Sequence, residues 1–205
     1  MFMQKNFNNM KILTLNGSDH LTHIPDVSGL SNLEKLSFQR CYNLIEIHNS
    51  VGYLNKLEIL DANGCFKLEC FPPLWLPSLK ELQLSRCESL KNFPELLCKM
   101  TNIKEIKLFH TFIEELPFSF GNLSELRRLT ISSVNFKILP ECLSECHHLM
   151  ELVLDKCKSL EEIRGIPPKL NYLSAVECES LSSSSRRKLL SQVCFSSLIC
   201  YFFHI

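Results

Sequence analysis

The stretch Met10-Lys11-Ile12-Leu13-Thr14-Leu15 decides the fold, because its spacing of apolar residues returns along the whole chain. Its first, fourth and sixth positions are apolar. The same six-residue frame begins again at Leu33, Leu57, Leu79, Ile103, Leu126, Leu149 and Leu170. The intervals between the eight starts are 23, 24, 22, 24, 23, 23 and 21 residues, and all 24 key positions are apolar. Since only 45% of the chain is apolar, this regularity indicates an internal repeat.

A second set of landmarks follows each frame. The ninth residue of the repeat is Ser18, Cys41, Cys65, Cys87, Thr111, Val134, Cys157 or Cys178. Three residues later six copies have a leucine, and the fifth and sixth copies have Ile113 and Phe136 one residue earlier. An apolar residue and a proline then close the turn in five copies, as in Ile24-Pro25 and Leu116-Pro117. This pattern and its length are those of leucine-rich repeats.

The repeats predict an α/β leucine-rich-repeat solenoid shaped like a horseshoe. Each frame gives one short strand, and because one coil cannot bury its apolar face alone, neighbouring coils stack. We expect an inner parallel sheet of about eight short strands, roughly 38 Å across at a spacing of about 4.8 Å. Short, proline-punctuated return segments predict loops and single helical turns on the outer side. The repeats occupy residues 1–181, followed by a Ser/Arg-rich linker at 182–188 and an apolar tail at 189–205 outside the domain.

The cysteines fit the same picture. There are eleven, an odd number, and the opening residues have no apolar stretch of a signal peptide. Five share the ninth position, where a small thiol suits the turn, and Cys146 is in register with the core positions Leu54 and Leu123. Free buried thiols predict a reducing compartment, so we expect a cytoplasmic or nucleo-cytoplasmic protein.

Several other function classes find no support in the residues. Twenty-two basic and twenty-two acidic residues cancel, which argues against a nucleic-acid partner. The six glycines have no nucleotide-binding spacing, and no cofactor is expected. A zinc site at Cys142, Cys146, His147 and His148 is less favoured than packing. The paired carboxylates Glu114-Glu115 and Glu161-Glu162 fall in solvent-facing turns, so the chain is not expected to be an enzyme.

The inner face of the sheet is the candidate site. Lys80, Lys104 and Arg127 form a row across the fourth to sixth strands, beside Glu81 and Glu105. Exposed aromatic side chains next to arginines are typical anchors of protein interfaces. We therefore expect a protein partner to contact a set of residues that we call the inner-face patch: Lys80, Arg86, Lys104, Lys107, Phe109, His110, Arg127, Arg128 and Tyr172.

Particular segments also carry a family resemblance. The segment from Pro25 to Leu36, the turn Cys87-Glu88-Ser89-Leu90, and the segments at 93–100, 115–123 and 165–175 resemble the repeats of plant intracellular disease-resistance receptors. The similarity covers about residues 7–190 and is greatest to the class with a TIR domain, a nucleotide-binding domain and leucine-rich repeats. The resemblance implies sensing of a pathogen effector, directly or through a guarded host protein, and restraint of the nucleotide-binding domain. The motifs of those other domains have no counterpart here, so the chain is interpreted as a fragment or truncated product.

Two alternatives stay open. An extracellular leucine-rich-repeat inhibitor or receptor ectodomain would suit the glycosylation sequons Asn16-Gly17-Ser18 and Asn122-Leu123-Ser124, but the unpaired thiols oppose it. An inactive truncated remnant is the other. The last 17 residues contain 12 apolar ones broken by serines, so a membrane anchor at 189–205 is less favoured than an altered gene product.

Overall fold

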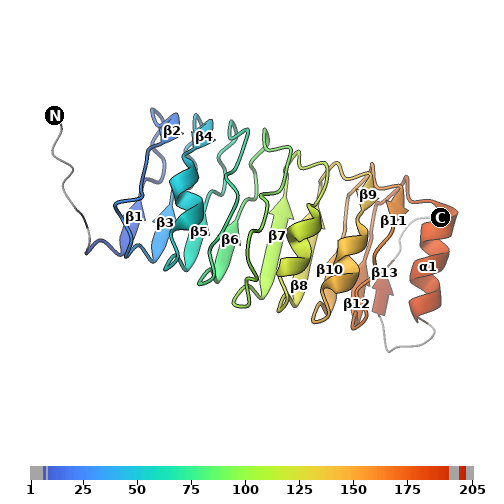
Figure 1. Ribbon diagram of the computed structural model, residues 1–205. Coiled ribbons are helices and arrows are strands. Elements are labelled where there is room, and N and C mark those ends of the chain that lie inside the picture. Colours follow the sequence, from blue (N-terminus) through green and yellow to red (C-terminus); the bar gives the residue numbers. More distant parts are fainter. Residues whose placement is uncertain (1–6, 8, 194–198, 202–205) are drawn as a thin grey trace.

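The main element of the fold is a nine-stranded parallel sheet. The computed structural model describes residues 7, 9–193 and 199–201, with side chains up to 189. The strands follow the order β1-β3-β5-β6-β7-β8-β10-β12-β13, so neighbouring coils lie side by side from one end of the solenoid to the other (Figure 1). Their bounds are β1 Ile12–Thr14, β3 Lys35–Ser37, β5 Ile59–Asp61, β6 Glu81–Gln83, β7 Glu105–Phe109, β8 Arg128–Ser132, β10 Glu151–Val153, β12 Tyr172–Ser174 and β13 Ile199–Tyr201.

The register of the sheet matches the repeat frame. Leu36 pairs with Leu13 on one side and Leu60 on the other, and Leu152 pairs with Leu129 and Leu173 in the same way. Each of these residues is the fourth of its frame, and all but Leu13 are buried. Stacking identical positions removes one apolar face from water in every coil, which confirms the predicted solenoid and its eight frame strands.

The return segments form the outer side. Three 3-10 helices, η1 Asn49–Tyr53, η2 Phe118–Asn122 and η3 Glu141–Glu145, lie across the coils from the sheet (Figure 1). Two-residue strands pair at the upper edge in that view: β2 His23–Ile24 with β4 Glu46–Ile47, and β9 Ile138–Leu139 with β11 Glu162–Ile163. The core fills the space between the sheet and these segments, and includes an edge-to-face contact between Phe93 and Phe120 with ring centroids 5.2 Å apart.

The C-terminal region differs from the sequence expectation. Residues expected to form a linker lie mostly in helix α1, Ser183–Val193, and part of the apolar tail forms β13, which pairs with β12. The Ser182 hydroxyl accepts a hydrogen bond from the Ser185 amide at 3.2 Å, as an N-cap does. Ser185 and Leu189, one helical turn apart, are both buried against the last coil. Isolated buried positions in a polar run give no visible periodicity.

The remaining tail residues, 194–198 and 202–205, lie outside the described part of the chain. Among the described residues, no helix has the length and apolar character that crossing a bilayer requires.

Candidate protein-binding face

A left-handed residue follows the strand in each of the eight frames. The eighth position of each repeat has a φ between 52° and 79°, whether it is glycine, as in Gly17 and Gly64, or a larger residue. The larger ones are Arg40, Arg86, His110, Ser133, Lys156 and Glu177. The amide at this position donates to a carbonyl of the next coil, as Arg86 does to Phe109 at 2.7 Å. This hydrogen bond between coils stabilises the positive φ of the eighth position, which is otherwise unfavourable for residues with a Cβ.

The ninth position forms a ladder of thiols. The Sγ atoms of Cys41, Cys65, Cys87, Cys157 and Cys178 donate to the carbonyl of the sixth frame residue in the preceding coil, at 2.9 to 3.5 Å. Burial raises the pKa of Cys65, Cys146 and Cys178 to about 12 and that of Cys157 to about 11. These thiols are therefore neutral at pH 7 and have a structural role.

Most cations of the inner-face patch are compensated within the face. Lys80 reaches Glu58 at 2.7 Å, Lys107 reaches Glu105 at 3.0 Å and Lys104 reaches Glu125 at 3.4 Å. Arg128 similarly pairs with Glu151 at 3.3 Å, across the β8–β10 boundary. Arg127 is exposed and makes no ion pair within the described part of the chain. The patch therefore presents alternating charges with two guanidiniums, those of Arg86 and Arg127, that have no carboxylate partner among the described residues, rather than a continuous positive stripe.

The patch is not one continuous site. Lys80, Lys104 and Lys107 line a hollow of about 540 Å³ together with Glu58, Glu81 and Glu105, over β5 to β7. Arg128 begins the next strand, β8, and Arg127 directly precedes it; at the far end of β8, Ser132 pairs with Phe109 of β7. Phe109 is half-buried, and His110 is exposed at the turn that follows it.

Two patch residues lie apart from this group. Tyr172 is half-buried on β12, which β8 and β10 separate from β7. Arg86 lines a second hollow with Arg40, Tyr42 and Phe66, residues that sequence reasoning did not select. The signal that could have found them is the aromatic residue directly after the ladder cysteine in the second and third repeats.

The other candidate clusters have ordinary structural surroundings. Cys142 and Cys146 are buried, whereas His147 and His148 are exposed and lie 3.8 Å from Glu145 and 3.2 Å from Glu125. No group of three or more metal-binding side chains occurs among the described residues. The Asn122 side-chain nitrogen, which a glycan would need, donates to the Leu96 carbonyl at 2.7 Å. That bond disfavours the extracellular alternative at this sequon.

Known proteins similar to this chain are plant disease-resistance proteins in sequence and a leucine-rich repeat domain in structure. No protein-family model matches the chain. It is 32% identical over 161 residues to TMV resistance protein N of Nicotiana glutinosa. This alignment covers 78% of this chain and 14% of that protein. The chain is 31% identical over 195 residues to disease resistance protein RML1A of Arabidopsis thaliana, covering 84% of this chain and 19% of that protein. The leucine-rich repeat domain of the type III effector XopL superposes with a TM-score of 0.69 at 27% identity, over 83% of this chain and 61% of that one.

The stacked coils and the repeat frame thus define a leucine-rich-repeat solenoid. In sequence, this solenoid is a leucine-rich repeat region of the kind found in plant disease-resistance proteins. The chain spans between a tenth and a fifth of the length of these curated relatives.

Proposed function

We propose that this chain is a non-enzymatic protein-interaction module of a plant immune receptor. Its similarity to disease-resistance proteins supports the setting, and its open sheet supports the mode of action. A solenoid exposes a long surface, which suits contact with another protein better than enclosure of a small substrate. The module helps to recognise a pathogen effector or a guarded host protein, and restrains the nucleotide-binding domain in the cytoplasm until recognition.

The observation that carries this proposal is the inner face over β6 to β8. There the half-buried ring of Phe109, the unpaired guanidinium of Arg127 and the charged hollow over β5 to β7 lie on adjacent strands. Exposed ion pairs such as Lys80–Glu58 stabilise a fold little, by about 0–1 kcal/mol. They can exchange partners when another protein approaches, whereas Arg127 already lacks one.

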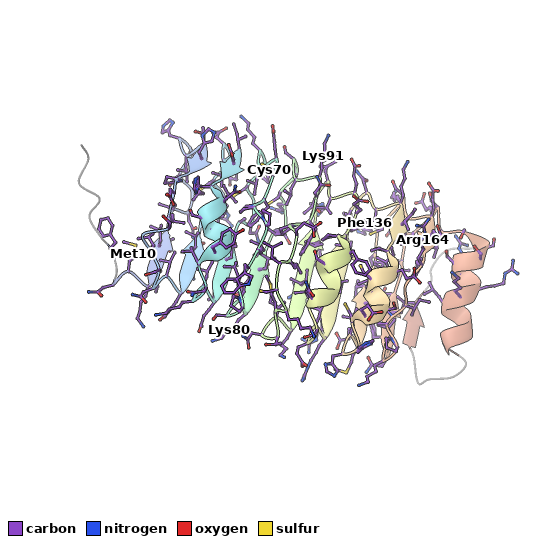
Figure 2. The ribbon with its side chains drawn as sticks, in the orientation of Figure 1. Met10, Cys70, Lys80, Lys91, Phe136 and Arg164 are labelled. Carbon is purple, nitrogen blue, oxygen red and sulfur yellow. The ribbon has the colours of Figure 1, made fainter. Side chains whose placement is uncertain are left out.

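The test is a charge and shape change confined to this face. In leaf tissue, the Phe109→Ala/Arg127→Glu variant should lose co-purifying partner proteins and change the defence response that the intact receptor gives. The matched control is Phe118→Ala/Lys91→Glu. Phe118 is 85% exposed on η2, and Lys91 lies at the opposite edge of the coils from Lys80 (Figure 2). If the inner-face variant leaves both readouts unchanged, the proposal is wrong.

A further inference from the structure

A second hollow, separate from the one over β5 to β7, lies where β3, β5 and β6 end. It has a volume of about 220 Å³, and Arg40, Tyr42, Gly64, Phe66 and Arg86 lie along it. Four of these five residues are outside the inner-face patch. The hollow is formed by three consecutive coils, so its shape depends on which residues the repeats place at two equivalent positions.

The first of these is the left-handed eighth position. It is Arg40 in the second repeat, Gly64 in the third and Arg86 in the fourth, each with φ between 56° and 79°. Two arginines about 10 Å apart at their backbones thus flank a residue without a side chain. A Cβ built on Gly64 would lie 3.5 Å from the Arg40 Cγ, so any larger residue there would begin to fill the gap.

The second is the tenth position, which supplies an aromatic wall. Tyr42 and Phe66 stack with ring centroids 5.0 Å apart and planes at 18°. They remain 41% and 36% exposed, so part of each ring is open to a partner. Rigid, partly exposed aromatic rings beside arginine have the composition of binding hot spots.

The charges around the hollow are unbalanced. Neither Arg40 nor Arg86 makes an ion pair with a carboxylate of the described chain, in contrast to Lys80 or Arg128. Asp61, the last residue of β5, is buried and accepts hydrogen bonds from the Gln39 side chain and the Asn63 amide, both residues that line the hollow. In the row of Tyr42 and Phe66, the neighbouring coils have Asp19 and Glu88, which also form no ion pair with either arginine among the described residues.

We propose that this hollow binds an acidic loop of a partner protein. A carboxylate of the loop lies over Gly64 between the two guanidiniums, and an apolar or aromatic side chain next to it packs on Tyr42 and Phe66. Arginine is suited to this role because its planar fork binds a carboxylate through two parallel hydrogen bonds. The inference rests on the proposed function only in that the chain binds proteins, since the hollow shares only Arg86 with the inner-face patch.

The experiment uses the full chain, isotope-labelled for NMR, and a probe peptide Asp-Glu-Trp-Glu-Asp with blocked ends. Titration should shift the Nε–H signals of Arg40 and Arg86 and the ring signals of Tyr42 and Phe66. The uncharged analogue Asn-Gln-Trp-Gln-Asn should cause little shift, and binding should weaken as salt rises. Arg40→Gln/Arg86→Gln should bind about tenfold more weakly.

Two further variants show whether a loss of binding comes from the hollow itself or from a general effect on charge and folding. Gly64→Asn keeps a residue that tolerates positive φ but places a side chain in the gap, and it should weaken binding without changing charge. Lys156→Gln removes a cation at the same left-handed position of another repeat, and binding should be unchanged.

The proposal is overturned if the uncharged analogue binds equally, if no shift appears at the hollow, or if a single-stranded oligonucleotide binds there in place of the peptide. The Phe109→Ala/Arg127→Glu variant should bind the probe like the natural chain. If that variant loses its partner in leaf tissue while the acidic peptide fails to bind the natural chain, only the proposal about this hollow is rejected, and the proposed function stands.

Discussion

Thr111 shows how a single residue departs from the repeat. It occupies the ninth position, where five other repeats have a cysteine whose thiol donates to the preceding coil. The Thr111 hydroxyl is buried and has no hydrogen-bond partner among the described residues. A buried, unsatisfied hydroxyl costs about 1–3 kcal/mol. The fourth and fifth coils therefore meet at a locally weak point of the ladder.

Thr111→Val should stabilise the chain. The substitution keeps the shape and removes the unsatisfied hydroxyl, so we expect the free energy of unfolding in urea to rise by about 1 kcal/mol. Thr111→Cys should also stabilise, because it supplies the donor used elsewhere in the ladder. Thr130→Val on the half-exposed inner face is the control and should change stability little. A lower urea midpoint for Thr111→Val would contradict this account.

The ladder thiols also predict a pH dependence. Burial raises the pKa of Cys65 and Cys178 from about 9 to about 12, so the folded state prefers the neutral thiol. Their contribution to stability is full below pH 9 and is lost as pH rises from about 9 towards 12, because the unfolded chain ionises first.

Urea unfolding at pH 8 and pH 10.5 measures this loss. We expect it to be on the order of 1 kcal/mol for each buried thiol, beyond the loss from other groups. Cys65→Ala/Cys178→Ala should be less stable at pH 8 but lose less between the two pH values. An equal loss in both proteins would show that the thiols do not contribute.

At the scale of elements, the coils pack closely where η1 meets the next coil. The Gly52 carbonyl accepts from the Trp75 amide at 2.7 Å, and a Cβ built on Gly52 would lie 2.0 Å from the Pro73 carbonyl oxygen. No side chain fits at that distance, so the coils would have to separate. This close approach fixes where η1 lies against the return segment of the third repeat.

Gly52→Ala should therefore destabilise the solenoid. We expect a loss of about 2 kcal/mol or more in unfolding free energy, because both contacts are with backbone that cannot rotate away. Gly29→Ala is a matched control, since a Cβ there meets nothing within 4 Å. Its stability should stay the same or rise by about 0.4–1 kcal/mol. Equal effects of the two substitutions in urea unfolding would refute the close-packing argument.

The elements also show what the sequence could predict. Strands such as β6 and β8 follow directly from the frame, because Leu82 and Leu129 need the same neighbours in every coil. Helix α1 was missed, since its packing depends on Ser185 and Leu189 within a polar run. The stack of Tyr42 and Phe66 was missed because it is a contact between coils, which a frame read one repeat at a time does not reveal.

At the scale of the whole molecule, the inner face and the outer side of the solenoid differ in the charged groups that they expose. The apolar side of every coil is buried in a single core, so function must lie on what the stack exposes. The inner face over β6 to β8 and the hollow at the ends of β3 to β6 carry the guanidiniums of Arg127, Arg40 and Arg86, which have no carboxylate partner in the described chain. The outer side over η2 exposes Phe118 beside the carboxylates of Glu141 and Glu145, and no arginine lines that hollow.

The most direct test of the central claim is site-specific photo-crosslinking in leaf tissue. A photoreactive phenylalanine analogue replaces Phe109 on β7 or, in the comparison protein, Phe118 on η2, so that an aromatic ring is kept at both positions. The account predicts a discrete crosslinked protein from position 109 and none, or a much weaker one, from position 118. Strong crosslinking from position 118 with none from position 109 would contradict it, because the partner would then contact the outer side of the solenoid.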